Sequence, residues 1–261
     1  MKIQDFVGKK QKGQKISMVT CYDYSFARIL ADSEVDCLLV GDSLAMVMHG
    51  HPTTLNASVK LMALHTAAVA RGASNKFIVG DLPFLSYRKD LSSNMTAIGE
   101  IMKAGAHAVK LEGARGNLKL IEHTVDSGVP VMGHLGLTPQ SIHQLGGFKV
   151  QGKEQKEHDQ IIQDAIDLEK AGCFSLVLEC VPMALAKEIS KTLKIPTIGI
   201  GAGVHTDGQV LVLQDMLGMN KDFHPKFLRT YMNGFEQIKS AFNQFHQDVS
   251  SEVFPSEKES Y

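Results

Sequence analysis

The sequence predicts an α/β fold, namely a single (β/α)8 TIM-type barrel over residues 1–261 with an N-terminal helical segment and a C-terminal helix. Short apolar runs recur along the chain, and helical patterns lie between most of them. Runs that are apolar throughout are typical of strands buried on both faces, as in parallel sheets. Strands that alternate with helices indicate right-handed βαβ units. About eight such units favour a closed barrel, and an open doubly wound sheet is the alternative.

The predicted elements follow one another at regular spacing. Strands are expected near 16–21, 37–42, 76–81, 107–112, 129–134, 175–180, 196–201 and 209–214. Helices are expected over 24–33, 58–71, 92–104, 117–127, 158–171 and 183–193. Glycines follow four of these helices, which suits the left-handed residue that commonly ends a helix.

A last amphipathic helix is predicted over 223–248. Its apolar stripe, which we expect to pack against the barrel or a neighbouring subunit, contains Phe227, Tyr231, Phe235, Ile238 and Phe242. Residues 250–261 are polar, and we expect a frayed tail there.

The composition limits the possible partners and location. Lys and Arg number 27 and Asp and Glu 28, which gives a net charge of −1 and argues against nucleic acid as a partner. The four cysteines form no CxxC pair, as expected for reduced core residues of a cytoplasmic protein. No apolar run is as long as a membrane span. The low net charge also suits a homo-oligomer.

Five successive apolar runs end in an ionisable residue, and the first two such residues are aspartates. Asp42 and Asp81 each follow Val-Gly at the end of a run. Carboxylates from neighbouring strand ends can share one hard cation, and Mg²⁺ prefers oxygen ligands. The alternative for either aspartate is a cap on the following turn, but the shared context favours the metal.

Lys110 and Glu112 lie two residues apart on one predicted strand, so their side chains point to the same face. If this face is the barrel mouth, Lys110 can bind a carboxylate or enolate oxygen of a substrate, and Glu112 can hold a metal-bound water. The alternative is a structural ion pair.

Glu179 and His134 end two further runs. Partial burial of Glu179 would raise its pKa towards the range of a general base, and the alternative is a salt bridge to a lysine. His134 is a possible donor to a substrate oxygen or else a structural residue.

Two glycine-rich loops have open interpretations. Residues 199–203 (GIGAG) either bind phosphate or allow close backbone approach. Residues 146–157 are either a mobile lid or an ordinary loop.

A cation, a lysine and a carboxylate base at one barrel mouth suit enolate chemistry on a 2-oxo acid. The cation would chelate the keto and carboxylate oxygens and stabilise the enolate, while the base removes the adjacent proton. The enolate would then react with a carbon electrophile.

At these residues the sequence resembles the ketopantoate hydroxymethyltransferase family. The matching segments run in order from about residue 20 to 225, and 133–141 is the longest and most specific. They are 22–27 (YDYSFA), 40–44 (VGDSL), 81–84 (DLPF), 109–113 (VKLEG), 133–141 (GHLGLTPQS), 149–152 (KVQG), 178–182 (LECVP) and 199–203 (GIGAG). Ala45 stands where the family usually has glycine.

The resemblance implies residue roles. Asp42 and Asp81 match Mg²⁺ ligands, and Glu112 matches an outer or water-bridged position at the metal. The substrate contacts, Asp42 and Asp81 among them, would include Ser43, Lys110 and His134, and Glu179 matches the catalytic base.

The resemblance also implies an activity. A one-carbon unit would pass from 5,10-methylenetetrahydrofolate to 3-methyl-2-oxobutanoate and give 2-dehydropantoate, on the way to pantothenate and coenzyme A. The family is commonly a decamer. The alternatives are a Mg²⁺-dependent lyase or mutase of the phosphoenolpyruvate/isocitrate type and a catalytically silent barrel that binds a metabolite.

Overall fold

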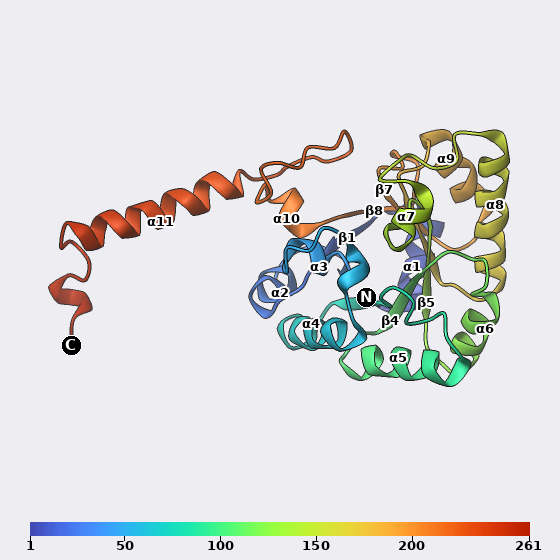
Figure 1. Ribbon diagram of the computed structural model, residues 1–261, viewed down its shortest axis with the longest axis horizontal. Coiled ribbons are helices and arrows are strands. Elements are labelled where there is room, and N and C mark those ends of the chain that lie inside the picture. Colours follow the sequence, from blue (N-terminus) through green and yellow to red (C-terminus); the bar gives the residue numbers. More distant parts are fainter. The chain divides into compact units, whose positions relative to one another are not determined.

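Eight parallel strands close into a barrel in which each strand pairs with the next and the last pairs with the first (Figure 1). This computed structural model describes all 261 residues, which form two units, residues 1–211 and 212–261. The strands are β1 (Ile16–Thr20), β2 (Cys37–Val40), β3 (Phe77–Asp81), β4 (Ala108–Glu112), β5 (Val131–Gly136), β6 (Ser175–Glu179), β7 (Thr197–Ile200) and β8 (Gly208–Leu211). The predicted closed barrel is confirmed, and the open-sheet alternative is wrong.

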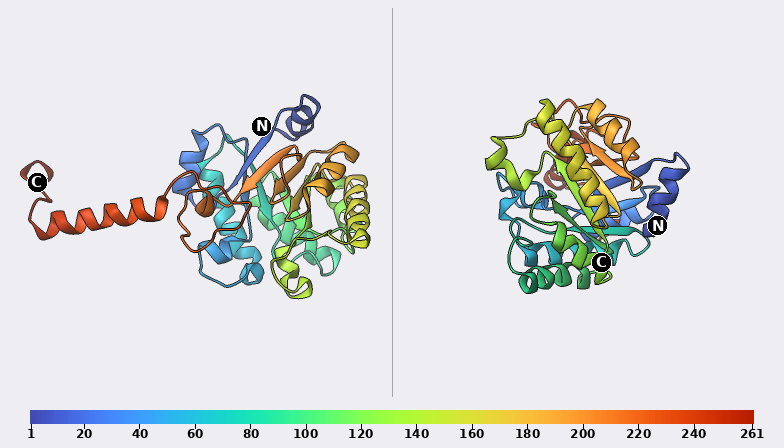
Figure 2. Two further views of the ribbon diagram at one scale, coloured as in Figure 1. Left: turned by 90° about the horizontal axis from the view of Figure 1, so that it is seen from above. Right: turned by 90° about the vertical axis from the view of Figure 1, so that its right-hand side faces the viewer.

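Helices surround the strands of the first unit (Figures 1 and 2). The long ones, all six of them predicted, are α2 (Tyr24–Ala31), α4 (Val59–Gly72), α5 (Leu91–Lys103), α6 (Leu118–Asp126), α8 (Gln155–Lys170) and α9 (Met183–Thr192). Short turns of helix after β2 and β5 are α3 (Leu44–Val47), η1 (Thr54–Asn56), η2 (Pro139–Ser141) and α7 (Ile142–Leu145). Residues 201–207 join β7 to β8 without a helix.

Side-chain caps begin three of these helices. Asp23, Ser58 and Asp90 each accept a hydrogen bond from a backbone N–H in the first turn of the following helix, at 2.9, 3.2 and 3.0 Å. Such caps satisfy N–H groups that have no partner inside the helix. The helices that follow β1, β2 and β3 therefore each begin at a defined residue.

Side chains along each strand point alternately into and out of the barrel, so every second residue lines the interior. Phe77, Val79 and Asp81 of β3 are two residues apart, so their side chains point to the same side of the sheet. The first two belong to a buried apolar cluster that includes residues of all eight strands. Asp81 thus continues an interior row at the carboxyl end of its strand.

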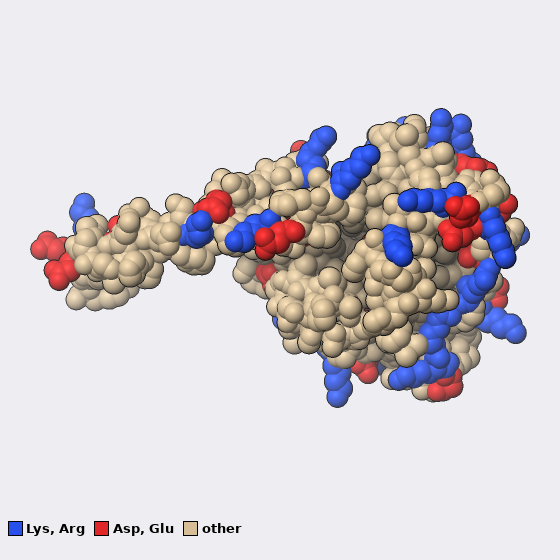
Figure 3. All heavy atoms as spheres, turned by 45° about the horizontal axis from the view of Figure 1, so that its top comes forward, with Lys and Arg blue, Asp and Glu red and all other residues tan.

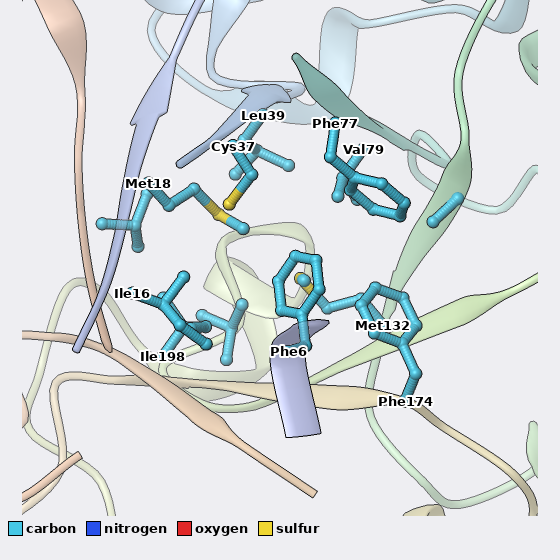
Figure 4. Close-up of a cluster of buried hydrophobic side chains, with 13 residues drawn as sticks. Phe6, Ile16, Met18, Cys37, Leu39, Phe77, Val79, Met132, Phe174 and Ile198 are labelled. Atoms are coloured by element: carbon cyan, nitrogen blue, oxygen red, sulfur yellow. The ribbon is translucent and has the colours of Figure 1, made fainter. Parts of the chain in front are cut away.

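Helix α1 (Ile3–Gln11) closes the opposite end of the barrel, as the predicted N-terminal helical segment. The Phe6 ring is fully buried, with ring centroids 5.2 Å from Phe77 and 5.1 Å from Phe174. Figure 4 shows Phe6 entering this cluster from α1. Lys10 Nζ fixes the helix through Ser190 O (2.7 Å) and Asp207 Oδ2 (2.8 Å).

The second unit contains α10 (Leu213–Met216), α11 (Gly234–Ser250) and η3 (Glu257–Glu259). The predicted start of the last helix at residue 223 is wrong. The helix begins at Gly234. Pro225 disfavours helical backbone at residue 224, and the backbone N–H groups of Tyr231, Gly234 and Phe235 bond to the carbonyls of residues 216–218. The prediction of one domain over 1–261 with a frayed tail at 250–261 stays a prediction.

The surface carries both charge signs. On the face seen in Figure 3, Lys and Arg side chains are interspersed with Asp and Glu. In none of the helices are length and apolar character together sufficient to cross a membrane.

Candidate active site

The register of the strands brings ionisable side chains together at their carboxyl ends. Asp81 pairs with Lys110 between β3 and β4, and Glu112 pairs with His134 between β4 and β5. Glu179 is the last residue of β6. The carboxyl end of a barrel's strands is where catalytic groups collect in this fold.

Asp42, Asp81 and Lys110 form one buried group. Asp42 N donates to Asp81 Oδ2 (3.1 Å), and Lys110 Nζ lies 2.8 Å from Asp81 Oδ1. Gly41 permits this close turn, because a Cβ at that position would lie 2.9 Å from Ser43 Oγ. The interpretation of the two aspartates as simple turn caps therefore does not describe their contacts.

Burial and like charge disfavour the ionised aspartates. Burial raises the pKa of Asp42 well above its ordinary value, and Asp81 and Glu112 raise it further. Burial also raises the pKa of Asp81, against the lowering effect of Lys110. Burial works against the charge on Lys110 too, but the three carboxylates outweigh it and raise the pKa of its ammonium group.

Glu112, His134 and Glu179 form a second group. Glu112 Oε1 lies 3.5 Å from His134 Nδ1, and Glu179 Oε2 lies 3.2 Å from His134 Nε2. Burial and Lys110, whose Nζ is 3.3 Å from Nδ1, disfavour the imidazolium, but the close contacts with both glutamates raise the pKa of His134 to about 9. Glu179 has a histidine partner here, and its side chain is 18% exposed, so solvent reaches it.

The donor set suits a divalent cation at Asp42 and Asp81. Four carboxylates face one lysine and one histidine, so acidic groups outnumber basic ones by two. No group of three or more His, Cys, Asp or Glu side chains forms an all-protein metal cage. Mg²⁺ does not need one, because it typically takes one or two protein carboxylates together with substrate and water.

Glu112 is engaged elsewhere. Its Oε2 accepts a hydrogen bond from Gln140 N (3.0 Å), and its Oε1 faces His134. A place in the outer shell of a metal stays a prediction for this residue.

Three residues that sequence reasoning did not single out complete the site. The Tyr22 hydroxyl is 2.8 Å from Ser43 Oγ and orients that serine. Gln140 and Tyr87 are buried and hydrogen-bonded to each other at 2.7 Å. Tyr22 and Gln140 lie inside segments that carry the family resemblance, which was the one available signal, and Tyr87 had none.

Packing accounts for the glycine-rich loops. A Cβ at Gly199 would lie 2.7 Å from Thr206 Oγ1, and one at Gly203 would lie 2.4 Å from Met183 Cγ. Close backbone approach therefore suffices to explain these glycines. In the loop 146–154, Gln151 N donates to Cys180 O (2.9 Å). Movement of this loop as a lid stays a prediction.

Buried carboxylates and a lysine at the carboxyl ends of the strands are typical of a (β/α)8-barrel enzyme. Residues 1–257 match the ketopantoate hydroxymethyltransferase family, and the chain belongs to that family. The expected hydroxymethyltransferase class is thereby confirmed.

Two relatives carry the name 3-methyl-2-oxobutanoate hydroxymethyltransferase. The one from Bdellovibrio bacteriovorus is 70% identical over 99% of this chain and 98% of its own length. The one from Coxiella burnetii is 59% identical over 98% of this chain and 96% of its own length.

A solved structure shares the fold at low identity. It is 2,3-dimethylmalate lyase, a member of the PEP mutase/isocitrate lyase superfamily, with a TM-score of 0.62 and 11% identity. The match covers 99% of this chain and 91% of that one. This likeness concerns the fold alone and adds no support to the lyase or mutase alternative.

Proposed function

We propose that the protein transfers a hydroxymethyl unit from 5,10-methylenetetrahydrofolate to 3-methyl-2-oxobutanoate through a Mg²⁺-stabilised enolate. The product would be 2-dehydropantoate, a precursor of pantothenate and coenzyme A. The observation that supports this best is the juxtaposition of a solvent-accessible carboxylate, Glu179, with a buried lysine and two adjacent buried aspartates. A base, a cationic donor and an acidic cation site are the groups that enolate formation requires.

Asp42 and Asp81 would hold the cation, with Glu112 at a bound water. Their mutual proximity, which raises the pKa of Asp42, supports this assignment because a divalent cation would relieve the repulsion. When bound, Mg²⁺ would supply Lewis acidity that favours loss of a proton from the carbon beside the keto group.

Lys110 would bind the carboxylate or enolate oxygen of the oxo acid. Asp81 fixes its ammonium group at 2.8 Å, so the donor is already in place before substrate arrives. Ser43, oriented by Tyr22, would add a hydroxyl contact to the substrate.

Glu179 would take the proton from C3 of the oxo acid. His134 Nε2 lies 3.2 Å from Glu179 Oε2 and leaves Oε1 for this task. The enolate carbon would form a new C–C bond with the methylene carbon, while the two C–N bonds that join this carbon to the folate break. Water would supply the hydroxyl group of the product, and tetrahydrofolate would leave with one proton of that water and the proton taken by Glu179.

Product formation followed by NMR in D₂O tests the proposal. The protein is mixed with 3-methyl-2-oxobutanoate, methylenetetrahydrofolate and Mg²⁺, with an EDTA control. We expect metal-dependent 2-dehydropantoate. Loss of the C3 proton signal without product would keep the enolate and remove folate as the donor. Neither product nor exchange from folded protein would favour the silent-barrel alternative.

We also infer that the protein is a cytoplasmic homo-oligomer, with a decamer implied by the resemblance. Helix α11 supports this, because Phe242, Phe245 and Val249 are 69%, 57% and 47% exposed, and Gly234 is its one buried residue. An apolar face of this kind is typical of a protein interface. Light scattering after gel filtration gives the mass, and a monomer would contradict the inference.

A further inference from the structure

Gln140 is a buried polar residue that contacts both groups of the site, the one around Asp42 and the one around Glu112. It lies in the η2 turn that follows β5, and 5% of its surface is exposed. A buried amide is costly unless its donors and acceptor are all bonded. Its partners therefore indicate what the residue does.

Gln140 donates hydrogen bonds to the site from both its side chain and its backbone. Its Nε2 donates to Asp42 Oδ2 (2.8 Å) and to Leu82 O (2.9 Å), the carbonyl next to Asp81. Its backbone N donates to Glu112 Oε2 (3.0 Å). Gln140 thus bonds the carboxylates of Asp42, which follows β2, and of Glu112, which ends β4, together with the carbonyl of the residue after Asp81.

Tyr87 determines which end of the amide faces Asp42. Its hydroxyl accepts from Glu112 N (3.3 Å) and lies 2.7 Å from Gln140 Oε1, to which it donates. If the amide were reversed, Oε1 would face the Asp42 carboxylate and the Leu82 carbonyl, which are both acceptors. The orientation is therefore set by the chemistry of the partners.

Gln140 bonds one oxygen of the Asp42 carboxylate and one of the Glu112 carboxylate. These bonds also fix the direction of the other oxygen of each carboxylate. Asp42 Oδ2 is engaged by the amide, which leaves Oδ1 for a ligand. Partners that bond ligating groups in this way orient them and raise the affinity of a metal site.

We propose that the side chain of Gln140 is a positioning group that holds the Asp42 carboxylate ready for a divalent cation, with Tyr87 fixing the direction of its amide. This inference rests on the proposed function, because it concerns the same cation site. It adds two residues, neither of which is itself a ligand, that set the affinity of that site.

The experiment measures Mg²⁺ binding to the full-length protein by titration calorimetry, together with kcat, KM and the thermal unfolding midpoint. Gln140→Met keeps the side-chain length but cannot hydrogen-bond, and Tyr87→Phe removes only the hydroxyl. Gln163→Ala is the matched control, because that glutamine makes an exposed hydrogen bond to Asp167 on α8.

We expect Gln140→Met to weaken Mg²⁺ binding by about 10- to 100-fold. Tyr87→Phe should give a smaller loss in the same direction, and Gln163→Ala none. We also expect kcat of Gln140→Met to fall, and raising the Mg²⁺ concentration should restore part of it. A purely structural role would lower the unfolding midpoint and leave the Mg²⁺ affinity of the folded protein unchanged.

A folded Gln140→Met variant with the affinity of the unmodified protein would overturn the inference while leaving the proposed function intact. If that variant does not fold, Tyr87→Phe decides: wild-type affinity in it overturns the inference. If the unmodified protein neither binds Mg²⁺ nor forms product, the proposed function fails and this inference fails with it.

Discussion

The two ends of the barrel use the same strands for opposite purposes. At the amino end, β3 contributes Phe77 to an aromatic cluster that the Phe6 ring completes. At the carboxyl end, four residues further along, β3 contributes Asp81 to a group of buried charges. Within one strand, the interior row changes from apolar packing to polar chemistry.

This difference shows how the fold separates stability from activity. Apolar contacts at the amino end favour folding without any requirement on charge. The carboxyl end buries carboxylates whose ionised forms are disfavoured, as the raised pKa of Asp42 shows. The comparison predicts that substitutions at one end change stability and substitutions at the other change turnover.

The largest expected effect is on catalysis, from Glu179→Gln. The amide keeps the shape but cannot accept a proton, so we expect kcat to fall about 10²- to 10⁴-fold. The unfolding midpoint should fall modestly, because the partly exposed Glu179 also stabilises the charged form of His134. Initial rates and a thermal melt measure both quantities. Glu188→Gln on α9 is the control, and unchanged turnover in the Glu179 variant would remove it as the base.

At the other end, Phe6→Ala should lower the free energy of unfolding by about 3–5 kcal/mol, because it leaves a cavity among buried rings. Turnover per folded molecule should be unchanged. Urea unfolding and active-site-normalised rates test this, with Leu64→Ala on the exposed face of α4 as the control. A lower kcat at full stability would break the comparison.

The pH dependence of stability should come from the polar end. The pKa of His134 is raised from 6.5 to about 9, so its charged form stabilises the folded state. This contribution is complete below the unfolded pKa and is lost as the pH rises through about 9.

The stability difference between the unmodified protein and His134→Gln should therefore shrink from pH 6 to pH 10. Urea unfolding in EDTA at both pH values measures it. A difference that stays constant across this range would mean that the pKa of His134 is not raised in the folded protein.

The smallest expected effect concerns backbone strain beside Glu179. Cys180 has a φ of 47°, a left-handed conformation that side chains disfavour. Cys180→Gly should raise the free energy of unfolding by about 0.5–1 kcal/mol, since the glycine gain is partly offset by its freedom in the unfolded chain. Cys180→Ala, which keeps a Cβ, should give no such gain; equal stabilisation by both would rule out strain as the cause.

The sequence predicted the barrel and most of the charged site, because both depend on local pattern. An apolar run that ends in Asp81 or Glu179 already contains the strand and its polar end. Gln140 could not be found this way. It lies in a turn where an exposed amide is normal, and its burial depends on Asp42, which is 98 residues away in the chain.

Two further features also depend on contacts between distant segments. Helix α11 begins at Gly234, eleven residues after the start that its apolar pattern predicts, because residues 231–235 bond to residues 216–218. The pairing of His134 with Glu179 depends on the register between β5 and β6, which no single segment encodes.

Helix α1 has a consequence for the order in which the chain assembles. Phe6 finds its partners at residues 77 and 174, and Lys10 finds its partners at 190 and 207. During synthesis, residues 3–11 must therefore wait until nearly two hundred later residues have left the ribosome (Lys10 and Ser190 are 180 positions apart). Helix α1 is therefore among the last elements of the barrel to reach its native contacts, although it precedes every strand in the chain.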